Sequence, residues 1–394
     1  MSGPHILIAG AGIAGIVAAL ALVQKGFEVS LYEQALELHE LGAGLQISPN
    51  GARVLSEIGL HPAMEAIASV ATSREMRLFS TGQSWRWENN ADAVLRYGLP
   101  FWLVHRGDFH QALVAALERN APGVIRVGTR CMGFEQDEGG VTLLLESGER
   151  CRGDALIGAD GVHSRIREAL FGARATFTGF VAWRGVVPME RLPTRLRQQS
   201  FTSWIGPSGF IVAYPMRRGE LLNFVGQIER DDWLSESWSE AGTVGECRRD
   251  FASWHEDVLE IIAAIDVPLK WALIAREPLP RWSVGRVSLL GDAGHPLLPF
   301  LGQGANMAIE DGMILARCLK AHADLAEALR RYETARLDRT ARMARASLQA
   351  VSHMQNPLLA DPEQAQAFMD RQFAPGTREA RDWIYEYDAM TVPI

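Results

Sequence analysis

The hydrophobic pattern near the start of the chain predicts a strand, a helix and a second strand in succession. Residues 5–9 form a short, nearly all-apolar run of the kind found in buried parallel strands. Apolar residues then recur at helical spacing from Ile13 to Leu20, and Gly26 ends that helix. Residues 28–33 resume the strand pattern. This order is typical of a βαβ unit in a parallel sheet.

Later segments predict a second, different sheet. Four stretches alternate apolar and polar residues, which indicates antiparallel strands with one face buried and one face available. They are residues 180–187, 200–205, 209–215 and 221–228. On the third stretch Phe210, Val212 and Tyr214 share a face, and this face is our candidate wall for a small aromatic substrate.

Helical patterns dominate the last third of the chain. We expect one helix over residues 245–265 and one long amphipathic helix from Met307 to about Val351, packed on the back of a sheet. The arginines from Arg330 to Arg345 are interspersed with acidic residues, which is typical of a solvent-exposed helix face.

Composition indicates a globular protein with neither a nucleic-acid nor a membrane partner. Its 394 residues are enough for two domains, 47% of them are apolar, and the net charge of -8 disfavours nucleic-acid binding. No apolar run is long enough to span a bilayer, and no basic segment precedes the first strand as in a secretion signal. The four cysteines lack disulfide or metal-site spacing, so we expect a cytoplasmic protein without a metal site.

A glycine motif at the first turn indicates a nucleotide site. Gly10 permits a tight turn, Gly12 lets the backbone approach a pyrophosphate, and Gly15 lets the helix pack closely on the strand. Glu33 lies 21 residues beyond Gly12, at the end of the second strand, where a carboxylate accepts hydrogen bonds from a ribose. The motif alone does not distinguish FAD from NAD.

Three predicted strands end in an acidic residue beside a glycine-rich turn or a helix start: Glu33, Asp160 and Asp292. After Asp292 comes a Pro- and Gly-rich loop, and then a helix that begins near Gly304. Free N–H groups at a helix start, with a carboxylate nearby, suit a large, partly anionic ligand that includes a flat ring. We therefore expect the three acids to converge on one extended ligand. Arg106 also ends an apolar strand, although a lone arginine there is more often a surface ion pair.

Together these motifs resemble single-component FAD-dependent aromatic hydroxylases, the flavoprotein monooxygenases of the salicylate hydroxylase and 3-hydroxybenzoate 6-hydroxylase type. The resemblance rests on the glycine motif that begins at Gly10 with Glu33, on residues 158–165, and on residues 291–304. The motifs follow the family's order, and the resemblance covers about residues 5–345.

The resemblance implies an α/β fold. A Rossmann-like FAD-binding domain is interleaved with an antiparallel-sheet substrate domain and followed by C-terminal helices. The implied boundaries are 1–75, 101–175 and 276–345 for the discontinuous FAD-binding domain, 76–100 and 176–275 for the substrate-binding β-sheet domain, and 346–394 for the C-terminal helical segment.

The resemblance also implies the chemistry. NADH or NADPH reduces FAD, O2 adds at flavin C4a, and the flavin C4a-hydroperoxide transfers its distal oxygen to an electron-rich ring carbon. No second nucleotide-binding βαβ unit is evident, so we expect NAD(P)H to bind transiently. The residues implied to bind FAD are Gly10, Gly12, Ala14, Gly15, Glu33, Gln34, Arg106, Asp160, Asp292, Gly302, Gln303, Gly304, Ala305 and Asn306.

The resemblance defines the substrate-binding residues less closely than the FAD-binding residues. The expected substrate contacts are Phe210, Tyr214, Gln227, Leu298, Pro299 and Phe300. We expect Tyr214, Pro299 and Gln46 at the reaction centre, with Arg184 as a further polar candidate. Hydroxybenzoate-specific members often have a histidine shortly before the tyrosine that aligns with Tyr214, and residues 210–213 contain none. A hydroxybenzoate, a hydroxylated N-heterocycle and a larger phenol therefore stay open as substrates.

Other functions are compatible with parts of the pattern. A flavin epoxidase or another monooxygenase of a nonaromatic substrate is the main alternative. An NAD-dependent dehydrogenase without flavin would be colourless, and a noncatalytic flavin-binding protein would be yellow without consuming NAD(P)H. A flavin halogenase is disfavoured because Trp85-Arg-Trp87 departs from that signature. The expected assembly is a monomer or a homodimer.

Overall fold

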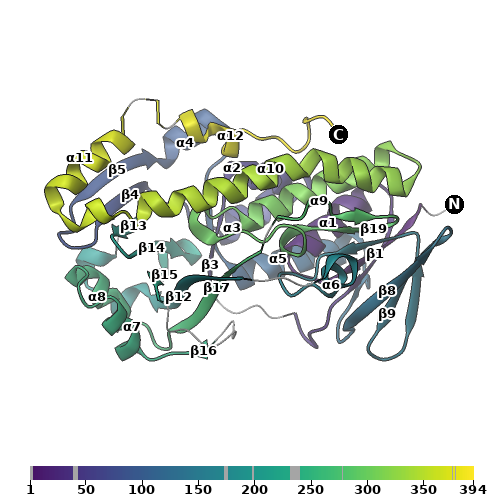
Figure 1. The fold of residues 1–394 in the computed structure, drawn as a ribbon, viewed down its shortest axis with the longest axis horizontal. Helices are drawn as coiled ribbons and strands as arrows, with labels where there is room; N and C mark the ends of the chain where they lie inside the picture. Colours follow the sequence, from purple (N-terminus) through teal and green to yellow (C-terminus); the bar gives the residue numbers. More distant parts are fainter. Residues whose placement is uncertain are drawn as a thin grey trace.

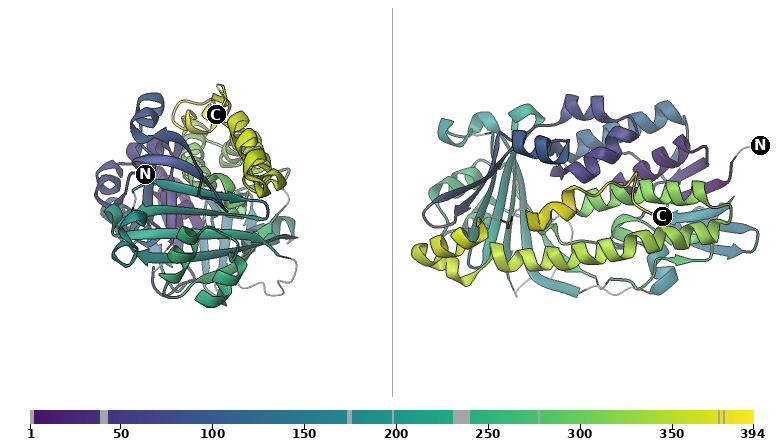
Figure 2. Two further views of the ribbon diagram at one scale, coloured as in Figure 1. Left: turned by 90° about the vertical axis from the view of Figure 1, so that its left-hand side faces the viewer. Right: turned by 90° about the horizontal axis from the view of Figure 1, so that it is seen from above.

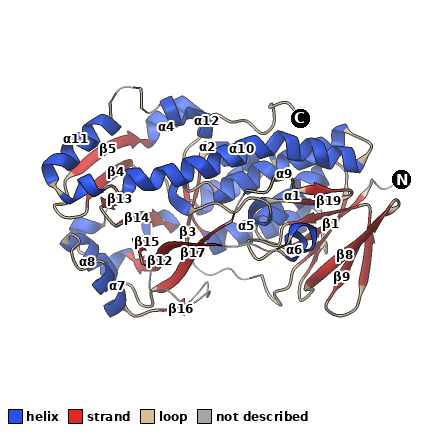
Figure 3. Cartoon of the chain, viewed as in Figure 1, coloured by secondary structure: helices blue, strands red, loops and turns tan. Residues whose placement is uncertain are grey.

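Two large β-sheets stand at opposite ends of an elongated molecule, and one long helix, α10 (Leu325–Met354), runs alongside both (Figure 1; Figure 2). Helix α9 (Gly304–Ala321) packs against α10 along the molecule (Figure 3). The computed structural model describes residues 3–38, 43–172, 176–197, 199–230, 240–276, 278–374, 376–377 and 379–394.

The first sheet has six strands in the order β18-β19-β11-β1-β2-β7. The strands are β1 His5–Ala9, β2 Glu28–Tyr32, β7 Ile125–Arg126, β11 Ala155–Gly158, β18 Ser283–Val284 and β19 Val287–Leu289. All neighbours are parallel except β18 and β19. Because the carboxyl ends of parallel strands meet at one edge, Glu33, Asp160 and Asp292 follow strands that end on the same side of the sheet.

Helices cover this parallel sheet, as its apolar strands require. They include α1 Ile13–Gln24, α2 Pro49–Glu57, α3 His61–Ile67, α5 Arg106–Asn120, α6 Arg165–Phe171 and α9. Helix α1 packs against both α5 and α9. A Cβ atom at Gly312 of α9 would lie 2.9 Å from the backbone nitrogen of Ala18. The absence of a side chain at Gly312 therefore sets how closely α1 and α9 approach.

The second sheet has eight strands in the order β16-β17-β12-β15-β14-β13-β4-β5. The strands are β4 Ser73–Leu78, β5 Ser84–Asn89, β12 Thr176–Pro188, β13 Phe201–Gly206, β14 Gly209–Met216, β15 Leu221–Glu229, β16 Glu240–Ala241 and β17 Leu269–Ala275. All neighbours are antiparallel except β13 and β4, which are parallel.

The two faces of the second sheet have different neighbours. Helices α7 (Val244–Asp250) and α8 (Glu256–Ala263) belong to one face, where Trp183 and Phe224 join their buried apolar cluster. The opposite face, with Phe210 as a member, packs on the loop after β19 and on the end of α10. This second face therefore looks toward the first sheet's half of the molecule.

Smaller elements connect and cap these layers. They are the two-stranded sheet of β3 Gly44–Ile47 and β6 Trp102–His105, the three-stranded sheet of β8 Cys131–Asp137, β9 Gly140–Leu145 and β10 Arg150–Gly153, and helices α4 Asn90–Tyr97, α11 Pro362–Gln372 and α12 Asp382–Tyr385. In the part of the chain that the structure describes, no helix is both long and apolar enough to cross a membrane.

The predicted helix from Met307 to Val351 is wrong as a single element, because residues 322–324 separate α9 from α10. Asp324 explains the break. Its Oδ1 atom accepts hydrogen bonds from the N–H groups of Ala326 (2.9 Å) and Glu327 (3.3 Å). An aspartate in this position caps a new helix start and satisfies N–H groups that lack intrahelical partners.

Two further predicted elements are also split. The expected helix over residues 245–265 is the pair α7 and α8, and α7 starts at a capping box formed by Thr243 and Glu246. The predicted strand that ends at Asp160 is β11, and the strand-like residues just before it form β10 in a different sheet. Asp154 lies between them, and its carboxylate accepts a hydrogen bond from the His5 N–H (2.7 Å).

The arginines of α10 do not all face solvent, so that prediction is wrong for two of them. Arg336 is 0% exposed and pairs with Asp311 and Glu310 of α9, both at 2.7 Å. Arg339 also pairs with Glu310 at 2.7 Å. Arg331, by contrast, is 53% exposed and pairs with Glu327. A buried charge is tolerated only when it is paired and hydrogen-bonded, which these contacts provide.

Replacing Arg336 with Leu should lower the free energy of unfolding by about 3–5 kcal/mol, because two buried carboxylates would lose their cation. Arg331→Leu on the same helix is the matched control and should cost less than about 1 kcal/mol, since its ion pair is exposed. Chemical denaturation of both variants measures the difference. Equal unfolding midpoints for the two variants would contradict the account of this network.

Candidate active site

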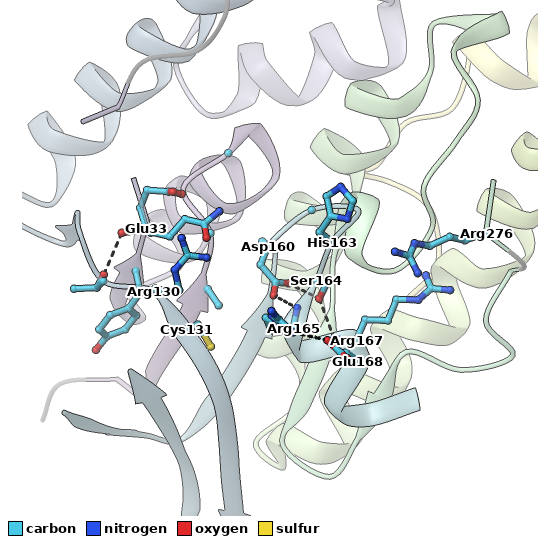
Figure 4. A pocket seen from close by; sticks show the side chains of 18 of the residues that line it. Glu33, Arg130, Cys131, Asp160, His163, Ser164, Arg165, Arg167, Glu168 and Arg276 are labelled. Carbon is cyan, nitrogen blue, oxygen red and sulfur yellow. Dashed lines mark hydrogen bonds and ion pairs between the residues drawn. The ribbon is translucent and has the colours of Figure 1, made fainter. Parts of the chain in front are cut away.

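A cleft of about 560 Å³ opens at the edge where the parallel strands end (Figure 4). The turn after β1, the end of β2, the start of β8 and the turn after β11 all contribute to its walls. Figure 4 shows Glu33 and Arg130 on one side of this cleft and Asp160 and His163 on the other. Gln34 also lines the cleft, as do Gly10 and Gly12.

Each of the three motif positions requires glycine for a different geometric reason. Gly10 has φ +104°, and a Cβ there would lie 2.4 Å from the Ala159 carbonyl oxygen. A Cβ at Gly15 would lie 1.9 Å from the Gly10 carbonyl oxygen. A Cβ at Gly12, however, would meet no protein atom within 4 Å. Packing explains Gly10 and Gly15, whereas Gly12 faces the cleft and leaves room for a ligand against the backbone.

The two acids at the rim of the cleft are already partly committed to backbone groups. Glu33 accepts hydrogen bonds from the Ala11 N–H (2.9 Å) and the Ala35 N–H (2.8 Å). Asp160 accepts from the Arg165 N–H (2.8 Å) and from the Ser164 hydroxyl, so it caps the start of α6. Burial raises the pKa of the Asp160 carboxyl, while these hydrogen bonds lower it. The structure therefore gives Asp160 a structural task that the sequence motif did not reveal.

Arg106 and Asp292 do not line this cleft. Arg106 is half-buried at the start of α5, and its N–H donates to the Ala43 carbonyl (2.8 Å). Asp292 lies in the short turn after β19, with its side chain accessible to solvent. Protein nevertheless surrounds this carboxyl, and desolvation raises its pKa, while nearby His295 and Arg106 lower it. Asp292 is therefore a carboxylate that stays accessible to solvent although protein lies on several sides of it.

The turn at Gly291 brings three elements together. Gly291 has φ +62°, and a Cβ there would lie 3.0 Å from the Ala14 Cβ and 3.2 Å from the Ala308 Cβ. Its N–H donates to Asp311 (3.0 Å), and His295 is also hydrogen-bonded to Asp311 (2.5 Å). His295 is thus held by a carboxylate of α9, and this contact fixes the loop.

The loop ends at the start of α9, where further side chains hold it. The Asn306 amide donates to the carbonyls of Gln46 (3.1 Å) and Gly302 (3.0 Å). The Gln303 amide donates to the Ser48 hydroxyl (3.0 Å). No side chain caps α9, so its first N–H groups, from Gly304 onward, lack a hydrogen bond within the described residues. Unsatisfied N–H groups at a helix start favour negative charge.

The open face of the second sheet carries the side chains that the sequence predicts to contact the substrate. Residues directly opposite each other on neighbouring strands share a face. Across β12, β15 and β14 the three successive rows on this face are Ala182-Gln227-Phe210, Arg184-Val225-Val212 and Val186-Asn223-Tyr214. The predicted substrate residues of this sheet therefore lie on one face.

An aromatic residue of the loop, Phe300, packs on that face. The Phe300 ring lies 5.3 Å from the Phe210 ring and 6.1 Å from the Phe180 ring, measured between centroids. The Leu298 carbonyl accepts a hydrogen bond from the Ser347 hydroxyl (2.7 Å). The exposed Pro299 accepts a hydrogen bond at its carbonyl from the Gly302 N–H (3.0 Å). The loop is thereby fixed against the sheet, with Phe300 as its buried apolar contact.

Several polar atoms around this wall lack partners. Within the described residues, no hydrogen bond is made by Gln46 Oε1, Gln227 Oε1, Asn223 Nδ2 or Arg184 Nε, and these atoms are buried. Buried polar atoms are usually paired, so a cluster of exceptions points to a ligand or a water site. Asn223 was missed at the sequence level, although it is a polar residue on the apolar face of an alternating strand. Trp271 of β17 was also missed, because a tryptophan in a strand is usually interpreted as a residue of the hydrophobic core.

Comparison with known proteins defines the family. The model of the FAD binding domain family matches residues 4–347. The chain belongs to this family. Together with the relatives that follow, this match confirms the predicted resemblance to FAD-dependent aromatic hydroxylases, and the function is that of an FAD monooxygenase that acts on aromatic compounds with NAD(P)H and O2.

Individual relatives extend over nearly the whole chain. A 3-amino-4-hydroxybenzoate 2-monooxygenase of Streptomyces platensis is 38% identical and covers 99% of this chain and 97% of its own. A 6-hydroxynicotinate 3-monooxygenase of Pseudomonas fluorescens is 36% identical over 99% and 97%. A 3-hydroxybenzoate 6-hydroxylase of Polaromonas naphthalenivorans is 35% identical over 87% and 86%.

Solved structures confirm the predicted α/β fold class with its C-terminal helices. Klebsiella pneumoniae HpxO, solved with FAD and uric acid, superposes with a TM-score of 0.85 and 27% identity over 100% of this chain and 98% of that one. A salicylate hydroxylase substrate complex gives a TM-score of 0.82 at 24% identity over 99% and 97%, a likeness of fold. The cleft fits the dinucleotide part of FAD, because the strand-end geometry and the free space at Gly12 match what its pyrophosphate needs.

Replacing Gly12 with Ala should weaken FAD binding by about tenfold or more, a loss of about 1.4 kcal/mol or more, while leaving the fold stable. The added methyl would project into the cleft without touching protein. Gly15→Ala is the contrasting variant, since its methyl would meet a backbone oxygen and should also lower the unfolding temperature. Flavin content and apoprotein unfolding measure both effects. A Gly12→Ala protein with normal flavin content would refute the assignment.

Proposed function

We propose that the chain hydroxylates a small phenolic or hydroxylated heteroaromatic ring bound on the open face of the second sheet, beside the loop at Phe300. One observation carries this proposal. That face combines apolar contacts at Phe210 and Phe300 with polar groups, at Tyr214 and Gln227 among others, that lack hydrogen-bond partners within the described residues. A flat apolar ring with one or two polar substituents matches such a wall.

The names of the relatives support this substrate class. They act on 3-amino-4-hydroxybenzoate, 3-hydroxybenzoate and 6-hydroxynicotinate, each of which is a single ring with a hydroxyl group. Bound FAD, once reduced by NAD(P)H, supplies the oxygen-activating chemistry. The tasks of the protein are to hold the ring, to orient it and to keep water away from the reaction.

The FAD-binding residues follow the order of the cofactor's parts. The turn at Gly10, with Glu33 at the strand end, serves the ADP half. Arg106 and Asp292 serve the middle of the cofactor, and the α9 start serves the flavin edge that becomes negative on reduction. The proposed set is Gly10, Gly12, Ala14, Gly15, Glu33, Gln34, Arg106, Asp160, Asp292, Gly302, Gln303, Gly304, Ala305 and Asn306.

The substrate residues divide by chemistry. Phe210, Leu298 and Phe300 supply apolar surface that excludes water, and Pro299 shapes the loop between them. The Tyr214 hydroxyl is not hydrogen-bonded within the described residues, nor is it sealed from solvent, so it is available to a substrate hydroxyl. The side chains of Gln46 and Gln227 add amide groups at the same wall.

Burial raises the pKa of Tyr214 far above its ordinary value, although the nearby Arg184 and Arg74 lower it. At neutral pH the tyrosine is therefore a neutral hydroxyl that donates or accepts a hydrogen bond. We therefore propose that Tyr214 orients the substrate and does not act as a base that removes a proton from it.

The organisation of the whole chain fits this function. We propose that residues 1–75, 101–175 and 276–345 act as the FAD-binding domain, 76–100 and 176–275 as the substrate domain, and 346–394 as a helical cap. A cytoplasmic location is supported by the four cysteines, which are free thiols and mostly buried. We propose that the enzyme works as a monomer or homodimer without nucleic acid.

The holoenzyme should oxidise NADH or NADPH faster when a suitable hydroxylated aromatic compound is added, with hydroxylated product formed in step. A panel of hydroxybenzoates and hydroxypyridines in an oxygen-uptake assay, with product and H2O2 both quantified, tests this. The proposal fails if no aromatic compound in the panel stimulates oxidation.

Tyr214→Phe should lower kcat/KM by about tenfold, the value of one lost hydrogen bond, and should raise the share of H2O2. Tyr97→Phe is the matched control, because its hydroxyl bonds Asp382 (2.8 Å) outside the substrate face. Flavin content should stay normal in both. Equal kinetics for the two variants would remove Tyr214 from the substrate site.

A further inference from the structure

Arg184 occupies the middle of the open sheet face. It lies on β12 in the row that continues through Val225 of β15 to Val212 of β14. The neighbouring rows carry Phe210 on one side and Tyr214 on the other. A cation is unusual on the wall of an apolar aromatic site, so its presence needs a physical reason.

The guanidinium of Arg184 lies over the Trp271 ring, with its Cζ atom 4.1 Å from the ring centroid. Its Nε atom is buried without a hydrogen bond. Its two terminal nitrogens have no hydrogen bond within the described residues either, but they are not sealed from solvent. The tryptophan thus holds the group in place, while its terminal donors point to accessible space.

No carboxylate among the described residues lies within ion-pair distance of Arg184. A second cation, Arg106, acts on it electrostatically, and so does the Tyr214 hydroxyl. Burial lowers the pKa of Arg184 to about 10, and Arg106 contributes to the same shift, so the group is still charged at neutral pH. Two neighbouring cations in a partly buried site favour an anionic ligand.

We infer that Arg184 binds a carboxylate group of the substrate through its terminal nitrogens, and that the natural substrate is an aromatic acid. This inference rests on the proposed function, since it places the ring on the same face. A guanidinium and a carboxylate match each other as a two-bond pair, which also fixes the plane of the ring's substituent. Arg184 is thereby a specificity-determining residue, while Tyr214 contacts the ring's hydroxyl group.

The test measures binding to the FAD-loaded enzyme from the change in flavin absorbance. The probes are 2-, 3- and 4-hydroxybenzoate and 6-hydroxynicotinate, each compared with its uncharged carboxamide. For the acid that binds best, Arg184→Gln should raise Kd on the order of 100-fold, whereas the Kd of its amide should change less than about threefold. Arg184→Lys keeps the charge without the planar fork and should recover part of the loss.

Arg195→Gln is the matched control, because Arg195 is an exposed arginine paired with Glu260. Flavin content and unfolding temperature are measured for every variant. Loss of FAD from both Arg184→Gln and Arg184→Lys would assign Arg184 to the cofactor and overturn the inference. Equal weakening of acid and amide, or equal binding of both by the wild type, would also overturn it while leaving the proposed function standing. If neither acids nor amides bind while a hydroxypyridine without a carboxylate stimulates NAD(P)H oxidation, only the inference fails; if no aromatic compound stimulates oxidation, both proposals fail.

Discussion

The buried ion pair between Asp311 and Arg336 is the interaction on which the site depends. Burial alone raises the pKa of the Asp311 carboxyl, but His295 and Arg336 outweigh burial and lower it to about 2. The same carboxylate accepts hydrogen bonds from the Gly291 N–H (3.0 Å) and from Arg336 Nε (2.7 Å). One charge therefore holds the turn after β19 and ties α9 to α10.

A second carboxylate extends this network to the far side of the loop. Glu310 accepts a hydrogen bond from the Asn50 amide (2.7 Å), and Asn50 also donates to Gln303 (3.2 Å). Asn50 in turn accepts a hydrogen bond from the Ser48 hydroxyl (2.6 Å). The loop between Gly291 and the start of α9 is thus fixed at both ends by charges buried in the helices behind it. A fixed loop is what a site needs to hold two flat rings in a defined geometry.

Much of the fold could be predicted because periodicity and glycine motifs report local structure. The apolar run before Gly10 and the acids at the strand ends place the parallel sheet and its ligand edge. The burial of Arg336 could not be predicted, because an arginine in an arginine-rich helix looks the same whether it faces solvent or a buried acid 25 residues earlier. The role of Asp160 as a cap of α6 was likewise hidden, since motif spacing does not show which hydrogen bonds a carboxylate already makes.

The substrate wall was predicted only in part, for a related reason. Alternation on β14 placed Phe210 and Tyr214 on one face, and the structure agrees. Strand order, however, is set by long-range pairing. Only the register of β12 against β15 shows that Arg184 lies in the row between Phe210 and Tyr214. Only the pairing of β12 with β17 brings Trp271 beneath its guanidinium. The cation at the centre of an apolar wall is a property of the sheet and not of any single strand.

The most direct test of the account is a crystal structure of the enzyme with FAD and a bound aromatic acid. The account predicts that the flavin ring lies at the start of α9, that the acid lies between it and Phe210, and that the loop at Phe300 separates the two from solvent. A flavin bound in the cleft at Gly12 with its ring away from α9, or an acid bound on another face of the second sheet, would contradict it.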